Sequence, residues 1–175
     1  MRVWTILVPV VAAVAVAAPA RGQSSPKADD RPLTDQAFVN EAAGSGMAEV
    51  MMGKLGQENA QNAAVKQFAA RMVEDHTKAN KELLTIVGDL KLTAPTASPA
   101  DHEKAMKNLS GSKGADFDKA FMAQMVMDHE MAVRLFERAS KELKNEQLRT
   151  FAANTLPTIR EHLKMAKEIG EKVGK

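Results

Sequence analysis

The sequence contains no cysteine. This absence excludes disulfides, thiolate metal ligands and a lipid-attachment cysteine. Aromatic residues are scarce, with no tyrosine, one tryptophan and six phenylalanines, so the eleven methionines are expected to fill part of the core. The chain also lacks an excess of one charge: 24 basic and 22 acidic residues are interleaved along it. This balance argues against a nucleic-acid groove, which needs a basic stripe.

Only one long hydrophobic run is present, from Ile6 to Ala18. It follows Arg2, is too short for a stable membrane span, and ends in the small-x-small pattern Ala18-Pro19-Ala20. We therefore predict a cleavable signal peptide over residues 1–20 and export to the periplasm or cell envelope. Since no second apolar run follows, the mature protein is expected to have no membrane span.

The rest of the chain divides into a polar leader and a helical domain. Residues 21–33 contain two prolines and are expected to be flexible, and residues 34–175 form the domain. Apolar residues recur in the domain at intervals of three and four, as on one face of an α-helix. The pattern predicts helices over 34–60, 62–90, 99–109, 115–143 and 145–172, with Thr34, Asn62, Ser98 and Asn145 as N-terminal caps.

Loop lengths predict how these helices are arranged. Tight loops join the first two long helices and the last two, so each pair is expected to form an antiparallel hairpin. The long connection over residues 91–114 can cross the whole bundle. An internal repeat supports two related hairpins, since residues 62–70 and 145–153 both follow the form N-x-x-[VL]-[KR]-x-F-A-A. The predicted fold is therefore all-α, a ferritin-like four-helix bundle of two antiparallel hairpins with a long crossover.

Three of the four histidines lie on or beside apolar helix faces, near the middle of their helices. They are His76, His129 and His162. Packed helices of similar length place their midpoints in one layer, so these imidazoles are predicted to meet in the bundle interior. Glu49, in the middle of the first helix, and Asp128 are candidates for an added carboxylate ligand. Neutral imidazoles with a carboxylate suit a transition-metal ion such as zinc, iron or copper.

Other residues around the histidines refine this prediction. No glutamate lies three residues before any of the three, so the Glu-x-x-His motif of di-iron bundles is absent. Asp75, Asp128 and Glu161 each precede one histidine and can accept the second ring N–H of a neighbouring one. The fourth histidine, His102, lies among charged residues and is predicted to be a solvated surface residue.

Two alternatives stand beside the metal site. The histidines can instead form a structural polar network with Asp75 and Asp128, in a non-catalytic structural or interaction module with an envelope protein as partner. The methionine-rich stretch 122–131 offers thioether ligands for Cu(I), although Met122 and Met125 also follow core spacing. The sequence has no evident nucleophile or phosphate-binding loop, which favours a binding role over an enzyme.

Several of these segments together resemble one bacterial family. They are the signal peptide, Asp35–Phe38, Gly46 with Glu49, Phe68–His76, Phe117–His129 and Phe151–Leu163. Over residues 34–172 the chain is similar to an exported helical family catalogued as a domain of unknown function, numbered 4142, whose members are often labelled outer membrane proteins. The resemblance implies a ferritin-like bundle and a periplasmic or surface location, and it supplies no established activity.

Overall fold

The computed structural model describes residues 32–175. The predicted signal peptide, residues 1–20, and residues 21–31 of the leader lie outside the described residues. The described part forms five α-helices and no strand: α1 (Asp35–Asn59), α2 (Ala63–Asp89), α3 (Ala100–Ser110), α4 (Gly114–Glu142) and α5 (Glu146–Val173). The all-α prediction is confirmed. No helix in this part of the chain is long and apolar enough to cross a membrane.

The helix starts follow from side-chain caps at three of the four predicted positions. The side chains of Thr34, Asn62 and Asn145 each accept a hydrogen bond from a backbone N–H of the first turn. The prediction for Ser98 is wrong. Because α3 begins one residue later than predicted, the cap position falls on Pro99, which has no side-chain cap bond.

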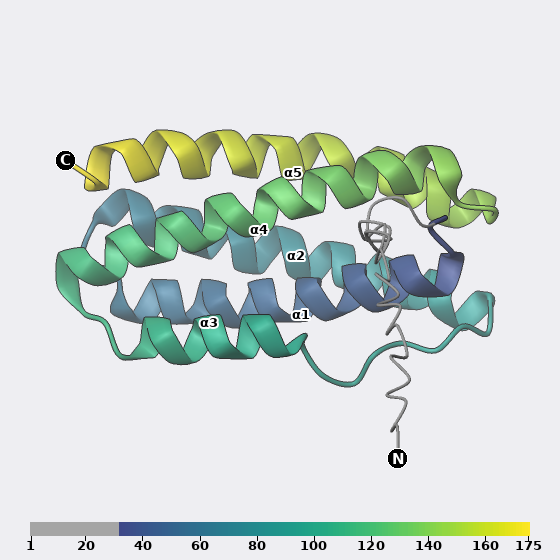
Figure 1. Ribbon diagram of the computed structural model, residues 1–175, viewed down its shortest axis with the longest axis horizontal. Helices are drawn as coiled ribbons and strands as arrows, with labels where there is room; N and C mark the ends of the chain where they lie inside the picture. Colours follow the sequence, from purple (N-terminus) through teal and green to yellow (C-terminus); the bar gives the residue numbers. More distant parts are fainter. Residues whose placement is uncertain (1–31) are drawn as a thin grey trace, which may run out of the picture. The chain divides into compact units, whose positions relative to one another are not determined.

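The helices form two antiparallel hairpins (Figure 1). One consists of α1 and α2, the other of α4 and α5; α1 also packs against α4, and α2 against α5. The connection between the hairpins runs back along the bundle and contains α3, which contacts α1 and α4. As a result α2 and α4 run in the same direction. The predicted pair of hairpins with a long crossover is confirmed, and the narrower ferritin-like assignment stays a prediction.

A buried carboxylate at the start of α4 holds the turn of the first hairpin. Asp118, only 3 % exposed, accepts hydrogen bonds from two consecutive backbone N–H groups of the α1–α2 turn, at 3.0 and 2.8 Å. Asp35, at the start of α1, does the same for the α4–α5 turn, at 3.1 and 3.3 Å. Each hairpin therefore fixes the turn of the other, in keeping with the internal repeat.

Two hydrophobic clusters fill the interior, one toward each end of the bundle. The first includes Phe38, Leu83, Phe136 and Phe151, and the second includes Met52, Met72, Phe121 and Met125. Between them, each long helix contributes a histidine or a carboxylate. These residues are Glu49 of α1, His76 of α2, Asp128 and His129 of α4, and His162 of α5. A polar layer therefore interrupts the apolar core near the middle of the bundle.

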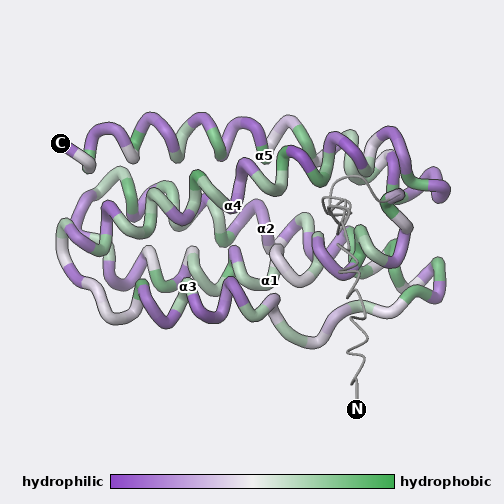
Figure 2. The backbone as a smooth tube through the Cα atoms, in the orientation of Figure 1, coloured by the Kyte–Doolittle hydropathy of each residue, from purple (hydrophilic) through white to green (hydrophobic). Residues whose placement is uncertain are grey.

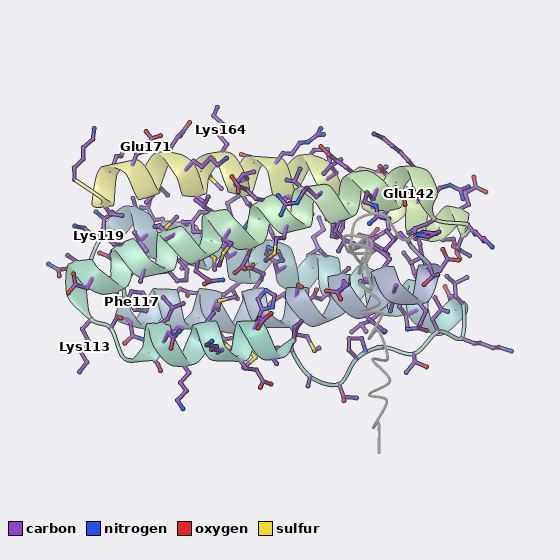
Figure 3. All side chains as sticks on the ribbon, in the orientation of Figure 1. Lys113, Phe117, Lys119, Glu142, Lys164 and Glu171 are labelled. Atoms are coloured by element: carbon purple, nitrogen blue, oxygen red, sulfur yellow. The ribbon has the colours of Figure 1, made fainter. Side chains whose placement is uncertain are left out.

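The outer faces of the helices are hydrophilic. Figure 2 shows hydrophilic residues along the outward turns of α5 and hydrophobic ones turned toward the other helices. In Figure 3, Lys164 and Glu171 project outward from α5. The chemistry that the chain can carry is therefore concentrated in the buried polar layer.

Candidate functional site

Three histidines from three helices meet in the polar layer. The ring centroids of His76, His129 and His162 are 5.5–5.7 Å apart. One ring nitrogen of each lies within 4.8 Å of the nitrogens of the other two. Phe68 closes the layer on one side, with its ring centroid 6.5 Å from that of His129 and 6.4 Å from that of His162. We call these three residues the histidine cluster.

Hydrogen bonds at the far side of two rings fix their tautomers. Nδ1 of His129 lies 2.8 Å from the carbonyl oxygen of Met125, to which it donates. Nε2 of His162 lies 2.8 Å from Oδ2 of Asp75 and donates to that carboxylate. In each neutral ring the other nitrogen therefore carries a lone pair. Those nitrogens, Nε2 of His129 and Nδ1 of His162, are buried without a hydrogen-bond partner among the described residues, as is Nε2 of His76.

Asp75 links the histidine cluster to the surface. It accepts a hydrogen bond from Nε of Arg71 at 3.2 Å in addition to the one from His162, and Arg71 also pairs with Glu161 at 2.9 Å. Burial alone would raise the pKa of Asp75, but the hydrogen bonds from His162 and Arg71 outweigh it and lower the pKa. Asp75 is thus a carboxylate that orients an imidazole, as around many protein metal ions.

The interior of the bundle keeps these imidazoles neutral. Burial, with repulsion from neighbouring histidines, lowers the pKa of His76 to about 3 and that of His129 to about 4. Burial also lowers the pKa of His162, against the opposing effect of Asp75. Neutral rings are the form that binds metal ions, so the histidine cluster is in its ligating form near neutral pH.

The two predicted carboxylates lie in a second group, with the fourth histidine. Ligand atoms of Glu49 (α1), His102 (α3) and Asp128 (α4) lie within 4.8 Å of one another, and all three residues are buried. We call them the carboxylate cluster. The structure therefore brings His76, His129 and His162 together but groups Glu49 and Asp128 with His102 instead.

The prediction that His102 is a solvated surface residue is wrong. His102 is only 8 % exposed, and its Nε2 lies 3.7 Å from Oδ1 of Asp128. The charged residues beside it in the sequence, Asp101, Glu103 and Lys104, are exposed, whereas His102 is not. The sequence does contain a pattern that indicates burial of His102. His102, Met106 and Leu109 follow the i, i+4, i+7 spacing of one helix face, and Leu109 is buried as well.

The methionine-rich stretch divides between the core and the surface. Met122 and Met125 are fully buried in one hydrophobic cluster, which agrees with their core spacing. Met127 and Met131 are 51 % and 45 % exposed. These two are one helical turn apart on α4 and do not belong to either cluster of candidate ligands.

Solved structures with the same fold include copper- and silver-bound proteins. CopM in its Cu(II)-bound form has a TM-score of 0.70 at 18 % identity, covering 81 % of this chain and 99 % of CopM. An Ag-bound form of CopM has a TM-score of 0.66 at 20 % identity, covering 80 % and 97 %. A DUF305 fragment from Deinococcus radiodurans has a TM-score of 0.70 at 14 % identity, covering 81 % and 99 %. At these identities the similarity shows the fold.

The sequence comparisons give the family. No curated protein matches the chain. The profile of the family described as Domain of unknown function (DUF4142) matches residues 17–169, which include every residue of the two clusters and all but the last four residues of α5. The chain therefore belongs to the DUF4142 family.

Proposed function

We propose that this protein is an exported metal-binding protein that holds one copper ion through His76, His129 and His162. The observation that carries the proposal is the set of three buried ring nitrogens without hydrogen-bond partners, one from each histidine. Export is supported by the signal-peptide pattern over residues 1–20.

The three nitrogens suit a cation because of how two of the rings are held. Two rings already donate their single N–H to Met125 and to Asp75, so their other nitrogens have only lone pairs to offer. A buried polar atom without a partner costs about 1–3 kcal/mol. A metal ion removes that cost at all three nitrogens together, whereas a proton on one ring would place a positive charge in the core.

Copper is favoured by the ligands and by the fold. Imidazole is a good ligand for copper, and the histidine cluster contains no carboxylate of its own. Asp75 supplies a negative charge just outside the histidine cluster, through its hydrogen bond to His162. CopM, which shares the fold, has been crystallised with Cu(II) and with silver. A silver ion carries the same single charge as Cu(I), so both copper oxidation states belong in the test.

The proposal is tested by metal-dependent melting of the purified, untagged, metal-free protein. We expect an excess of Cu(I) or Cu(II) to raise Tm, because a ligand that binds only the folded state stabilises it by about 2.7 kcal/mol at a hundredfold excess over Kd. For a domain of this size the rise is about 5–10 °C. His162→Ala and His129→Ala are expected to abolish it while retaining the helical circular dichroism signal.

A methionine variant serves as the matched control. Met127→Ala combined with Met131→Ala removes the exposed thioethers and leaves the histidine cluster intact, so it should keep the full rise in Tm. The proposal is wrong if copper does not raise Tm of the unaltered protein. It is also wrong if the methionine variant loses the rise while His162→Ala keeps it, since copper would then bind on the surface of α4.

A further inference from the structure

We propose that the carboxylate cluster of Glu49, His102 and Asp128 is a second, separate cation site, which binds a divalent ion that prefers oxygen ligands, of the Mn(II) class. This site does not depend on the proposed copper site. It draws its ligands from α1, α3 and α4, and no residue belongs to both clusters.

The first support is geometric. One oxygen of Glu49, one oxygen of Asp128 and one ring nitrogen of His102 lie within 4.8 Å of one another. Nε2 of His102 is 3.7 Å from Oδ1 of Asp128, too long for a hydrogen bond. The three side chains thus face a common point without being bonded to each other.

The second support is a pair of buried atoms without partners. Oε2 of Glu49 and Nδ1 of His102 are buried and have no hydrogen bond among the described residues. Glu49 is 4 % exposed and His102 is 8 % exposed. The described residues leave both atoms unsatisfied; a cation held beside Glu49 and Asp128 would satisfy the carboxylate oxygen, while the His102 nitrogen nearest Asp128 is Nε2 rather than Nδ1.

The charges of the cluster also favour a divalent ion. Two carboxylates face each other inside the bundle, and no lysine or arginine among residues 32–175 forms an ion pair with either. Asp128 is held in place by Gln124, whose Nε2 donates to both carboxylate oxygens at 2.9 and 3.0 Å. A divalent cation would neutralise both carboxylates where a monovalent one would not.

The ligand types separate this site from the histidine cluster. Carboxylate ligands suit Mn(II) and similar ions, whereas three imidazoles suit copper or zinc. The site also gives α3 a role, since this short helix in the crossover brings the third ligand, His102, against α1 and α4.

The experiment titrates metal-free, untagged protein with Mn(II) and counts bound ions by electron paramagnetic resonance of free Mn(II). We expect one Mn(II) per chain. Glu49→Gln, which keeps the side-chain shape, and His102→Gln, which keeps a polar side chain at that position, are each expected to weaken binding at least tenfold. His76→Gln alters only the histidine cluster and should leave Mn(II) binding within about twofold, the scatter of independent sites.

The outcomes also distinguish the two sites. Glu49→Gln should keep the copper-dependent rise in Tm, and His76→Gln should lose it while keeping Mn(II). Absence of Mn(II) binding to the unaltered protein would overturn the second site and leave the copper proposal standing. Mn(II) binding that survives in both Glu49→Gln and His102→Gln would overturn it too, since the ion would then lie elsewhere. Circular dichroism of each variant verifies that it is folded.

Discussion

His129 combines nearly complete burial with a nitrogen that has no partner. Its ring is 1 % exposed, its Nδ1 donates to the Met125 carbonyl, and its Nε2 has no hydrogen bond among the described residues. Protonation would add a charge to this ring beside two other imidazoles. Burial, followed by repulsion from His162, therefore lowers the pKa of His129 to about 4, although the bond to Met125 opposes the shift.

This lowered pKa predicts how stability of the metal-free protein depends on pH. An unfolded histidine has a pKa of about 6.5, so between pH 6.5 and 4 the unfolded chain binds a proton at residue 129 that the folded chain does not. The free energy of unfolding therefore falls as pH falls, by about 1.4 kcal/mol per pH unit from this residue. We expect His129→Gln to remove that contribution, as measured by urea unfolding from pH 7 to pH 4.5.

The comparison between the two proteins separates the histidine cluster from titrating groups that residue 129 does not affect. Glu49 has a raised pKa, so its contribution runs in the opposite direction: it adds stability as pH falls through its folded pKa. It is present in both proteins and cancels to first order in their difference. Parallel stability curves for the unaltered protein and His129→Gln would show that His129 is not held neutral by burial.

At the scale of the helices, α1 shows how packing overrides propensity. Four glycines reduce its intrinsic helix propensity by about 1 kcal/mol each relative to alanine. At Gly56 a Cβ atom would lie 2.8 Å from both Cβ of Ala69 on α2 and Cζ of Phe121 on α4. The close approach of three helices at this point requires a residue without a side chain.

This contact predicts opposite effects for alanine at two helical glycines. Gly56→Ala is expected to destabilise the protein by about 1–3 kcal/mol, because the methyl group overpacks the contact with Ala69 and Phe121. Gly88→Ala is the matched control: no atom lies within 4 Å of its added Cβ, so it should stabilise the protein by up to about 1 kcal/mol. Denaturant melts of both variants measure the difference, and equal effects would contradict the packing role.

The helices themselves could be predicted closely from the sequence because the residues that determine each helix lie close together along the chain. Apolar spacing and the side-chain caps Thr34, Asn62 and Asn145 are read within a few residues. The error at Ser98 is a shift of one residue at a helix start that has no side-chain cap. The contact of Asp118 with the α1–α2 turn joins residues more than fifty positions apart. Nothing in the local pattern of α4 indicates it.

At the scale of the whole molecule, sequence reasoning predicted one polar layer but not its division into two clusters. The middle position of each histidine in its helix is sufficient to predict that they meet. Whether Glu49 faces the other histidines or His102 depends on the rotation of α1 and on where the crossover places α3. The rotation of α1 and the position of α3 are set by close packing at residues such as Gly56 and by the path of residues 90–113. The spacing of residues along one helix describes neither.

The polar layer separates two apolar clusters that would otherwise form one core. If the histidines serve metal binding, they lower the stability of the metal-free protein in return for a site, as functional residues often do.

We therefore expect His129→Leu, which replaces a fully buried ring by an apolar side chain of similar size, to raise the free energy of unfolding of the metal-free protein by about 1–3 kcal/mol. The copper-dependent rise in Tm should disappear. His129→Ala is the matched control and should destabilise the protein, because it leaves a cavity. If His129→Leu is instead less stable than the unaltered protein without metal, His129 stabilises the metal-free core, and the stability cost assigned here to its unpartnered nitrogen is contradicted.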